Sequence, residues 1–226
     1  MLDKKVLEAK SIYKTFTDPV KIDVLKDVSF TLDYGEFASI IGKSGCGKST
    51  LLYILSTMDT DYKGELFIDN QSTYKKSEKE LAAIRNEKIG FVFQFHYLLN
   101  EFSVLKNIML PGFKSNKFTE EELEKRAMNL LEDLDIKKLA HKMAHQLSGG
   151  EKQRVAIARS MINDPIIIMG DEPTGNLDNK NTDIVFEIFN ELTSKYKKTL
   201  LIVTHDMSFA DKTNRIITMD DGRIVS

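Results

Sequence analysis

The segment IIGKSGCGKST at positions 40–50 has the clearest chemistry in the chain. Within it, Gly42–Ser49 fits the pattern G-x-x-x-x-G-K-S, with apolar residues before it and the helix-like LLYIL after it. Its glycines lack the side chains that would hold the backbone away from a polyphosphate, so successive N–H groups can point inward as a nest. A helix starting near Lys48 adds its N-terminal dipole. The predicted phosphate-binding residues are Gly42, Lys43, Ser44, Gly45, Cys46, Gly47, Lys48, Ser49 and Thr50.

Two side chains of this loop have specific predicted roles. Lys48 would reach the β- and γ-phosphates of a nucleoside triphosphate, and the Ser49 hydroxyl would take one position around Mg²⁺. The alternative is a glycine turn with an exposed lysine. Other motifs in the chain have to decide between the two.

A second pattern, PIIIMGDE at positions 165–172, places two carboxylates after a run of apolar residues. Ligands of open α/β sheets bind at the C-terminal ends of strands, where these carboxylates would lie. Asp171 is the candidate for holding Mg²⁺, and Glu172 is the candidate for polarising the water that attacks the γ-phosphate. The alternative is a strand end with two solvated acids.

A third pattern, LSGGE at positions 147–151, runs directly into the helical KQRVAIARSMI. Ser148 can cap that helix, and Gly149 and Gly150 leave its first N–H groups open to an anion. Taken locally, the segment is only a well-capped helix. Together with the glycine loop it is a second anion cradle, about a hundred residues from the first, whereas a single nucleotide needs only one.

The elements that must position these residues alternate between strand and helix. Period-two or continuous apolar patterns predict strands, the first two of which are half-buried and antiparallel. These strands lie at residues 6–12, 24–32, 64–69, 89–94, 165–172, 199–206 and 215–219, with a final hairpin turn at 220–222. Helical spacing follows the loop and recurs at 77–87, 118–136, 152–162 and 182–196, with Thr119 as a helix cap. The predicted fold class is α/β with a helical insertion over about 95–161.

Composition limits the remaining possibilities. The 226 residues are 42% hydrophobic and carry a net charge of −2, which suits one large domain and gives no basic face for nucleic acid. The single cysteine, Cys46, excludes an internal disulfide and suits a reducing compartment. No apolar run approaches the roughly 20 residues of a spanning helix, and the first ten residues lack the apolar core of a signal peptide. If the protein works at a membrane, we expect another chain to hold it there.

Six segments in this order resemble the ATP-binding cassette (ABC) ATPases over essentially the whole chain: GKSGCGKS, Gln94, LSGGE, IIIMGDE, GNLD and His205. The resemblance implies a RecA-like P-loop NTPase core with an antiparallel β subdomain, at residues 1–94 and 162–226, and an inserted helical subdomain at about 95–161. It also implies a head-to-tail homodimer in which each ATP lies between the loop of one chain and LSGGE of the other. The implied roles are adenine stacking for Phe16, sensing of Mg²⁺ and the membrane partner for Gln94, a dimer contact for Asp178 and γ-phosphate support for His205.

Finer features resemble one group within the family. QFHYLLNEFSVLKNIMLP, EPTGNLD and the compact length are similar to the Lol and MacB group, and QFHYLL is closest to the lipoprotein-releasing ATPases. The resemblance implies integral membrane permease subunits as partners and a peripheral place on the cytoplasmic face of the inner membrane. Phe95, Tyr97, Leu98 and Leu99 follow Gln94, where the family meets its membrane subunit. These apolar side chains either face that partner or are buried under the helical lobe.

Three functions stay open at this point. They are lipoprotein or peptide export, regulation of the cell envelope like that by the division protein FtsE, and soluble work on ribosomes or DNA. The last is disfavoured because its members usually carry two fused cassettes or long insertions.

The loop departs from common family patterns at Lys43 and Cys46. We hypothesise that Cys46, near a helix N-terminus and Lys48, is a reactive thiol. The alternative is a small packing residue.

Overall fold

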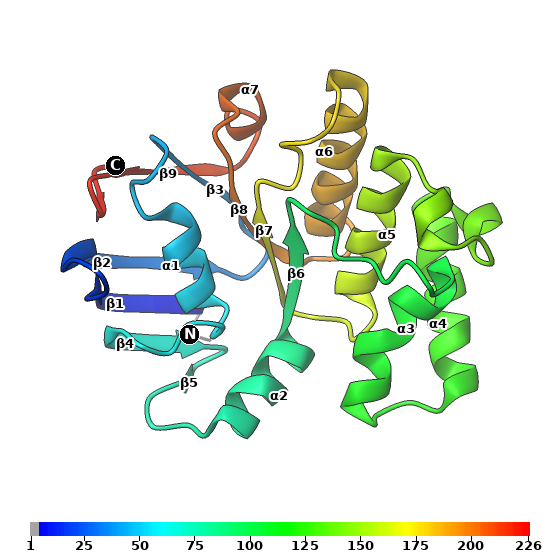
Figure 1. The fold of residues 1–226 in the computed structure, drawn as a ribbon, viewed down its shortest axis with the longest axis horizontal. Coiled ribbons are helices and arrows are strands. Elements are labelled where there is room, and N and C mark those ends of the chain that lie inside the picture. Colours follow the sequence, from blue (N-terminus) through cyan, green and yellow to red (C-terminus); the bar gives the residue numbers. More distant parts are fainter. Residues whose placement is uncertain (1–4) are drawn as a thin grey trace.

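The computed structural model describes residues 5–226, so residues 1–4 of the predicted domain lie outside the described range. The strands are β1 (Lys5–Phe16), β2 (Ile22–Asp33), β3 (Phe37–Gly42), β4 (Lys63–Ile68), β5 (Gln71–Ser72), β6 (Ile89–Phe93), β7 (Ile167–Asp171), β8 (Thr199–Val203), β9 (Arg215–Asp220) and β10 (Arg223–Ile224). The helices are α1 (Lys48–Leu55), α2 (Glu78–Lys88), α3 (Val104–Ser115), α4 (Glu120–Asp133), α5 (Gly149–Met161), α6 (Asn179–Ser194) and α7 (Met207–Ala210), with short 3₁₀ turns η1 (Lys137–Leu139) and η2 (Ala144–Gln146). Figure 1 shows their arrangement.

A six-stranded sheet in the order β10-β9-β3-β8-β7-β6 forms the centre of the molecule. From β9 to β6 neighbouring strands are parallel, and only the final hairpin β9–β10 is antiparallel. Strands β3, β7 and β8 are almost wholly buried, as their continuous apolar runs predict. Because these three strands are parallel neighbours, their C-terminal ends meet at one edge of the sheet. That edge carries the glycine loop, the Asp171–Glu172 pair and His205.

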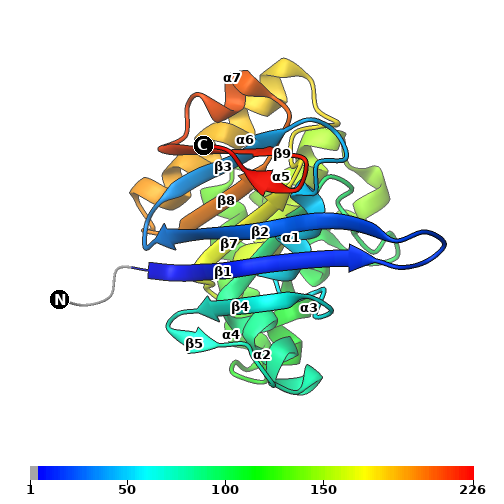
Figure 2. The same ribbon diagram turned by 90° about the vertical axis from the view of Figure 1, so that its left-hand side faces the viewer.

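A four-stranded antiparallel sheet, in the order β2-β1-β4-β5, covers the side of the core that holds α1 (Figure 2). Strands β1 and β2 pair antiparallel with several register shifts, which confirms the predicted pairing and extends both strands beyond the predicted bounds. Their inward residues, Leu7, Leu32 and others, join Leu51 and Leu52 of α1 in the largest hydrophobic cluster. The helix that follows the glycine loop is therefore packed between the two sheets.

Helices α3, α4 and α5 form a separate lobe at the right of Figure 1. Ile108, Leu123, Leu131 and Val155 are fully buried in a hydrophobic cluster of this lobe. Thr119 caps α4 in a capping box with Glu122, which confirms its predicted role. Helix α5 also contributes Ile157 to the cluster on the outer face of the central sheet. The helix that begins at LSGGE thus joins the lobe to the core.

One predicted strand environment is wrong in part. The apolar run of β6 predicts burial on both faces, but β6 is the edge strand of its sheet, and Phe91 and Phe93 are only half-buried. Their rings pack against each other at this edge, with centroids 4.3 Å apart and planes tilted by 39°. The final hairpin is confirmed by the pairing of Arg223 with Asp220. Over residues 5–226, every helix is too short or too polar to span a bilayer.

Candidate functional site

The glycine loop leaves β3 at Gly42 and enters α1 at Lys48. Gly45 has φ +79°, and a Cβ placed there would meet nothing within 4 Å, so this side of the loop is open to a ligand. Gly47 has φ +102°, and a Cβ there would lie 2.9 Å from both Leu25 Cδ2 and the Val24 carbonyl oxygen. Only glycine fits both the backbone angle and the space at position 47. Lys43, Ser44 and Gly45 are exposed, so the crest of the loop faces outward.

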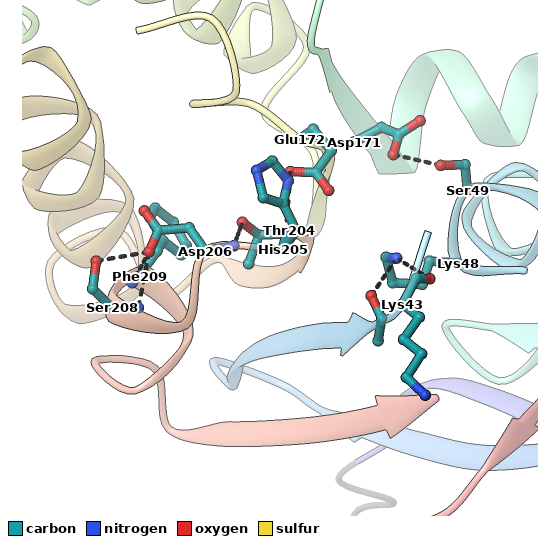
Figure 3. Close-up of polar contacts among 11 residues, drawn as sticks. Lys43, Lys48, Ser49, Asp171, Glu172, Thr204, His205, Asp206, Ser208 and Phe209 are labelled. Atoms are coloured by element: carbon teal, nitrogen blue, oxygen red, sulfur yellow. Dashed lines mark hydrogen bonds and ion pairs between the residues drawn. The ribbon is translucent and has the colours of Figure 1, made fainter. Parts of the chain in front are cut away.

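Lys48 lies inside the curl of this loop, with its side chain 8% exposed. Its Nζ donates to the Gly42 carbonyl at 2.7 Å and to the Lys43 carbonyl at 3.0 Å (Figure 3). A polyphosphate bound in the loop would offer its own oxygens to the same ammonium group. Lys48 lies beside Ser49 and Thr50 in the first turn of α1, and its role in binding phosphate stays a prediction.

Ser49 and Asp171 meet across the loop and the sheet. The Ser49 hydroxyl donates to Asp171 Oδ1 at 2.9 Å (Figure 3). The Tyr53 hydroxyl donates to Oδ2 at 3.2 Å. No lysine, arginine or histidine of the described chain forms an ion pair with Asp171. A partly buried carboxylate without a cation, next to a hydroxyl, is a donor set that fits Mg²⁺.

The described residues include no group of three or more His, Cys, Asp or Glu side chains that could hold a metal ion. Magnesium is usually bound by one or two carboxylates together with substrate phosphates rather than by an all-protein cage. The pair Ser49 and Asp171 suits a metal shared with a nucleotide. Sequence reasoning missed Tyr53, although its spacing of four residues from Ser49 puts both hydroxyls on one helix face.

Glu172 and His205 lie next to each other just beyond β7 and β8. His205 Nδ1 is 2.8 Å from Glu172 Oε2, and the His205 backbone N–H donates to the same oxygen at 3.3 Å. Glu172 has φ +49°, a left-handed angle that costs a non-glycine residue roughly 1–3 kcal/mol and recurs at functional sites. The carboxylate is 17% exposed, and the imidazole is 71% exposed. The pair can hold a water molecule and accept its proton at a position open to a ligand.

The turn that carries His205 is fixed by hydrogen bonds that sequence reasoning did not identify. Thr204 Oγ1 accepts from the Asp206 N–H at 3.0 Å, and Asp206 Oδ1 caps α7 by accepting from the Ser208 N–H at 2.8 Å. The Ser208 hydroxyl also donates to this carboxylate and holds the pKa of Asp206 below its ordinary value. The sequence D-M-S, three residues after the end of a buried strand, is the signal for this cap.

LSGGE forms the predicted cap of α5. Ser148 Oγ accepts from the Glu151 N–H at 3.3 Å, and Glu151 Oε2 accepts from the Ser148 N–H at 2.8 Å. A Cβ at Gly149 would meet only Leu177, at 3.9 Å, so the space there is open. A Cβ at Gly150 would lie 2.2 Å from Asn181 Oδ1, so the missing side chain also allows packing against α6, and the predicted role of its N–H stays a prediction.

Ser148 does not meet the glycine loop within one chain. No hydrogen bond or ion pair within residues 5–226 joins residues 148–151 to residues 42–50. Figure 1 places α1 and α5 on opposite sides of β6 and β7. One chain therefore carries the two candidate anion cradles at separate places.

Three further predicted residues lie around the site without contacting its centre. Phe16 ends β1 with a 45% exposed ring, over which Lys14 Nζ lies 5.0 Å from the centroid. Gln94 lies beside Gly175, in the turn that follows Glu172. Asp178 caps α6 by accepting from the Asn181 N–H at 2.8 Å. The predicted roles in adenine stacking, metal sensing and dimer contact stay predictions.

Cys46 is buried, with 7% of its surface exposed, and belongs to the main hydrophobic cluster. Its Sγ would be 2.8 Å from a Cβ added at Gly42, so the thiol fills the space behind the loop. This environment favours the packing alternative over a reactive thiol.

An apolar surface follows Gln94. We call the exposed residues Phe95, Tyr97 and Leu99 the Gln94 face; they are 61%, 65% and 45% exposed, whereas Leu98 packs against the helical lobe. Beside the face is a cavity of about 300 Å³ whose lining includes Phe91, Tyr97 and Arg159. Arg159 donates to the carbonyl of Tyr97 at 2.7 Å and keeps this segment against α5.

Comparison with known proteins identifies relatives of the whole chain. The family model described as "ABC transporter" matches residues 25–175. The chain is 44% identical to the lipoprotein-releasing system ATP-binding protein LolD of Cytophaga hutchinsonii, over 98% of this chain and 100% of that protein. It is 43% identical to LolD of Bacteroides fragilis, over 97% of this chain and 100% of that protein.

Solved structures agree with these relatives. The dimeric structure of MJ0796, described as a bacterial ABC transporter cassette, superposes with a TM-score of 0.89 at 39% identity and 97% coverage of both chains. A second dimeric structure of the same cassette, in a post-hydrolysis state with ADP and phosphate, has a TM-score of 0.89 at 38% identity and the same coverage.

Proposed function

The chain belongs to the ABC transporter family of ATPases, and from this premise we propose that it drives lipoprotein release from the inner membrane as the ATP-hydrolysing subunit of a permease complex. Two observations together support this proposal. Ser49 of the glycine loop meets Asp171 at one edge of the sheet, and relatives that match over the full length are named as lipoprotein-releasing ATP-binding proteins. The FtsE-like and MacB-like alternatives have no such support. Work on ribosomes or DNA also lacks support, since the net charge is −2.

Within one site, we assign the steps to particular atoms. The loop N–H groups and Lys48 Nζ bind the phosphates, and Ser49 with Asp171 would hold Mg²⁺, which neutralises charge on the β- and γ-oxygens when bound. Gln94 is proposed to sense that metal. Glu172 accepts the proton of the attacking water, and His205, 2.8 Å away, keeps the carboxylate oriented and faces the γ-phosphate. Phe16 offers its exposed ring to the adenine.

We further propose that the second cradle, Ser148 with Gly149 and Gly150, serves the ATP bound by a second copy of the chain, with Asp178 at the contact. The separation of the two cradles within one chain supports this proposal. So does the dimeric form of the similar cassette. Since a dimer of this kind traps ATP between two subunits, nucleotide binding favours the closed state.

A crosslink tests the shared site. Ser44 and Ser148 are both exposed, and in the proposed dimer they flank one phosphate chain from opposite subunits. In a Cys46→Ser, Glu172→Gln background, the double change Ser44→Cys with Ser148→Cys should give a disulfide-linked dimer on non-reducing gels when ATP is present, and little without it.

Each single cysteine variant serves as the control and should stay monomeric on the same gel. An ATP-dependent disulfide that forms within one chain would contradict the shared site. So would an absence of any link in a sample that elutes as a dimer.

The permease is proposed to bind the Gln94 face. Exposed aromatic side chains beside a cavity are typical of protein interfaces, where a few anchors carry most of the binding free energy. A partner seated there would touch the turn next to Gln94 and Gly175, which leads to Glu172. We accordingly propose that the subunit lies against the cytoplasmic side of its membrane partner.

Tyr97→Ser should reduce co-purification with the permease by roughly tenfold or more, because an aromatic anchor at an interface is worth about 2 kcal/mol. The ATPase rate of the isolated subunit should stay unchanged. Tyr74→Ser is the matched control, since Tyr74 is 67% exposed, compared with 65% for Tyr97, but lies in the antiparallel subdomain. Equal recovery of permease with both variants would exclude the Gln94 face as the docking surface.

The cargo is tested by purification from membranes. The tagged chain is expressed together with the membrane subunits that are encoded beside it. Lipoproteins should co-purify with this complex in an amount that depends on ATP. Recovery of the permease with unlipidated peptides, and without lipoproteins, would favour peptide export. Recovery of cell-division proteins with no cargo would favour a regulatory role.

A further inference from the structure

Tyr53 makes a contact that the steps above do not use. It projects from α1, four residues after Ser49, and its hydroxyl donates to Asp171 Oδ2 at 3.2 Å. Ser49 donates to the other oxygen, Oδ1, at 2.9 Å. The two hydroxyls therefore hold one carboxylate at two points, and it cannot turn about its Cβ–Cγ bond without losing a hydrogen bond.

The ring of Tyr53 is itself held in place. It is 37% exposed and packs against Phe91 of the edge strand β6, with ring centroids 6.2 Å apart. Phe91 in turn packs on Phe93 of the same strand, with ring centroids 4.3 Å apart. The position of the Tyr53 ring is thus set by β6, the neighbour of the strand that carries Asp171.

We infer that Tyr53 is a positioning residue for the Mg²⁺ site, which holds Asp171 with Oδ1 toward Ser49, the other residue that would hold the metal. A serine hydroxyl that offers a lone pair to a metal keeps its O–H. Ser49 would therefore still donate to Oδ1, and Tyr53 is the side chain among the described residues that donates to Oδ2 and fixes the rotation of this carboxylate. Partners that orient a metal ligand typically contribute 10- to 100-fold to metal affinity. The inference rests on the proposed role of Asp171 as a magnesium ligand.

Tyr53→Phe tests the inference because it removes the hydroxyl and keeps the ring that packs on Phe91. We expect the affinity for Mn²⁺, measured by electron paramagnetic resonance of the full chain bound to a non-hydrolysable ATP analogue, to fall about tenfold. Affinity for the analogue without metal should change less than twofold, which also reports an intact glycine loop.

Tyr196→Phe is the matched control. Tyr196 likewise donates to an aspartate, Asp133 Oδ2 at 3.0 Å, and is 42% exposed, but it lies between α6 and the helical lobe. Its loss should leave Mn²⁺ affinity unchanged. A twofold or smaller change for Tyr53→Phe overturns the inference, as does an equal loss in Tyr196→Phe.

The Asp171→Asn variant distinguishes a failure of this inference about Tyr53 from a failure of the proposed metal site. If Asp171→Asn abolishes Mn²⁺ binding while Tyr53→Phe has no effect, only the role of Tyr53 fails. If Asp171→Asn leaves Mn²⁺ affinity intact, the metal assignment fails and the role of Tyr53 fails with it.

Discussion

Replacing Glu172 with glutamine should slow ATP hydrolysis by about 10²- to 10⁴-fold while ATP binding stays intact, because the amide cannot accept a proton from the attacking water. Glutamine has the size of glutamate and can keep an oxygen near His205, which lies 2.8 Å from the native carboxylate. The loop that binds the phosphates is on a different strand and is not altered. The measurement is the rate of phosphate release at saturating Mg-ATP, together with the affinity for a fluorescent ATP analogue.

The same substitution should produce a stable dimer in the presence of ATP. At nucleotide concentrations about 100-fold above Kd, each bound ATP contributes roughly 2.7 kcal/mol to the state that binds it, and two contribute about 5. Moving a two-state equilibrium from 1:99 to 99:1 needs about 5.5 kcal/mol. The free energy of binding two ATP molecules is thus almost enough to shift the protein from monomer to closed dimer. Because the variant cannot hydrolyse ATP, the closed dimer should persist. Gel filtration with and without Mg-ATP measures this shift.

Glu36→Gln is the control for these two measurements. Glu36 is 17% exposed, as Glu172 is, but it precedes β3 at the end of the strand opposite the glycine loop. Its substitution should change neither turnover nor assembly. A Glu172→Gln protein that stays monomeric with saturating Mg-ATP would count against closure driven by nucleotide.

The glycine loop and the carboxylates at the strand ends can be predicted from the sequence, because they depend on which elements follow one another along the chain. A buried strand, a glycine loop and a helix are consecutive in the chain, and parallel strands bring their C-terminal ends to one edge. Asp171 and Val203 pair across β7 and β8, so Glu172 and His205, one and two residues further on, emerge together. Knowledge of strand pattern and parallel pairing is enough to predict this contact.

Other features depend on how elements rotate and pack, which local patterns do not encode. The contact between Tyr53 and Asp171 joins residues 118 positions apart and requires the rotation of α1 on the sheet. The apolar run of β6 gives no sign that it ends the sheet, since an edge strand under a helical lobe is as apolar as a central one. The close approach of Asn181 to Gly150, which leaves no room for a side chain there, also depends on how α6 packs on α5.

Replacing Lys48 with alanine should weaken ATP binding by about 100-fold or more. Hydrogen bonds to a charged group contribute roughly 1.5–3 kcal/mol each, and loss of about two such bonds to phosphate oxygens corresponds to two or more factors of ten in Kd. The lysine is 8% exposed, and its Nζ lies within 3.0 Å of two loop carbonyls, so its ammonium group is held inside the loop. Titration with a fluorescent ATP analogue in the presence of Mg²⁺ measures the loss.

Lys43→Ala distinguishes this specific loss from a general loss of positive charge. Lys43 belongs to the same loop and carries the same charge, but its side chain is exposed and extends away from Ser49 and Asp171 (Figure 3). Because its proposed contribution is a backbone N–H, truncation of the side chain should change ATP affinity by less than about threefold, within the range of a single exposed charge. If both lysine variants lost affinity equally, the loop would attract ATP through its net charge. The inward position of Lys48 would then have no special part in binding.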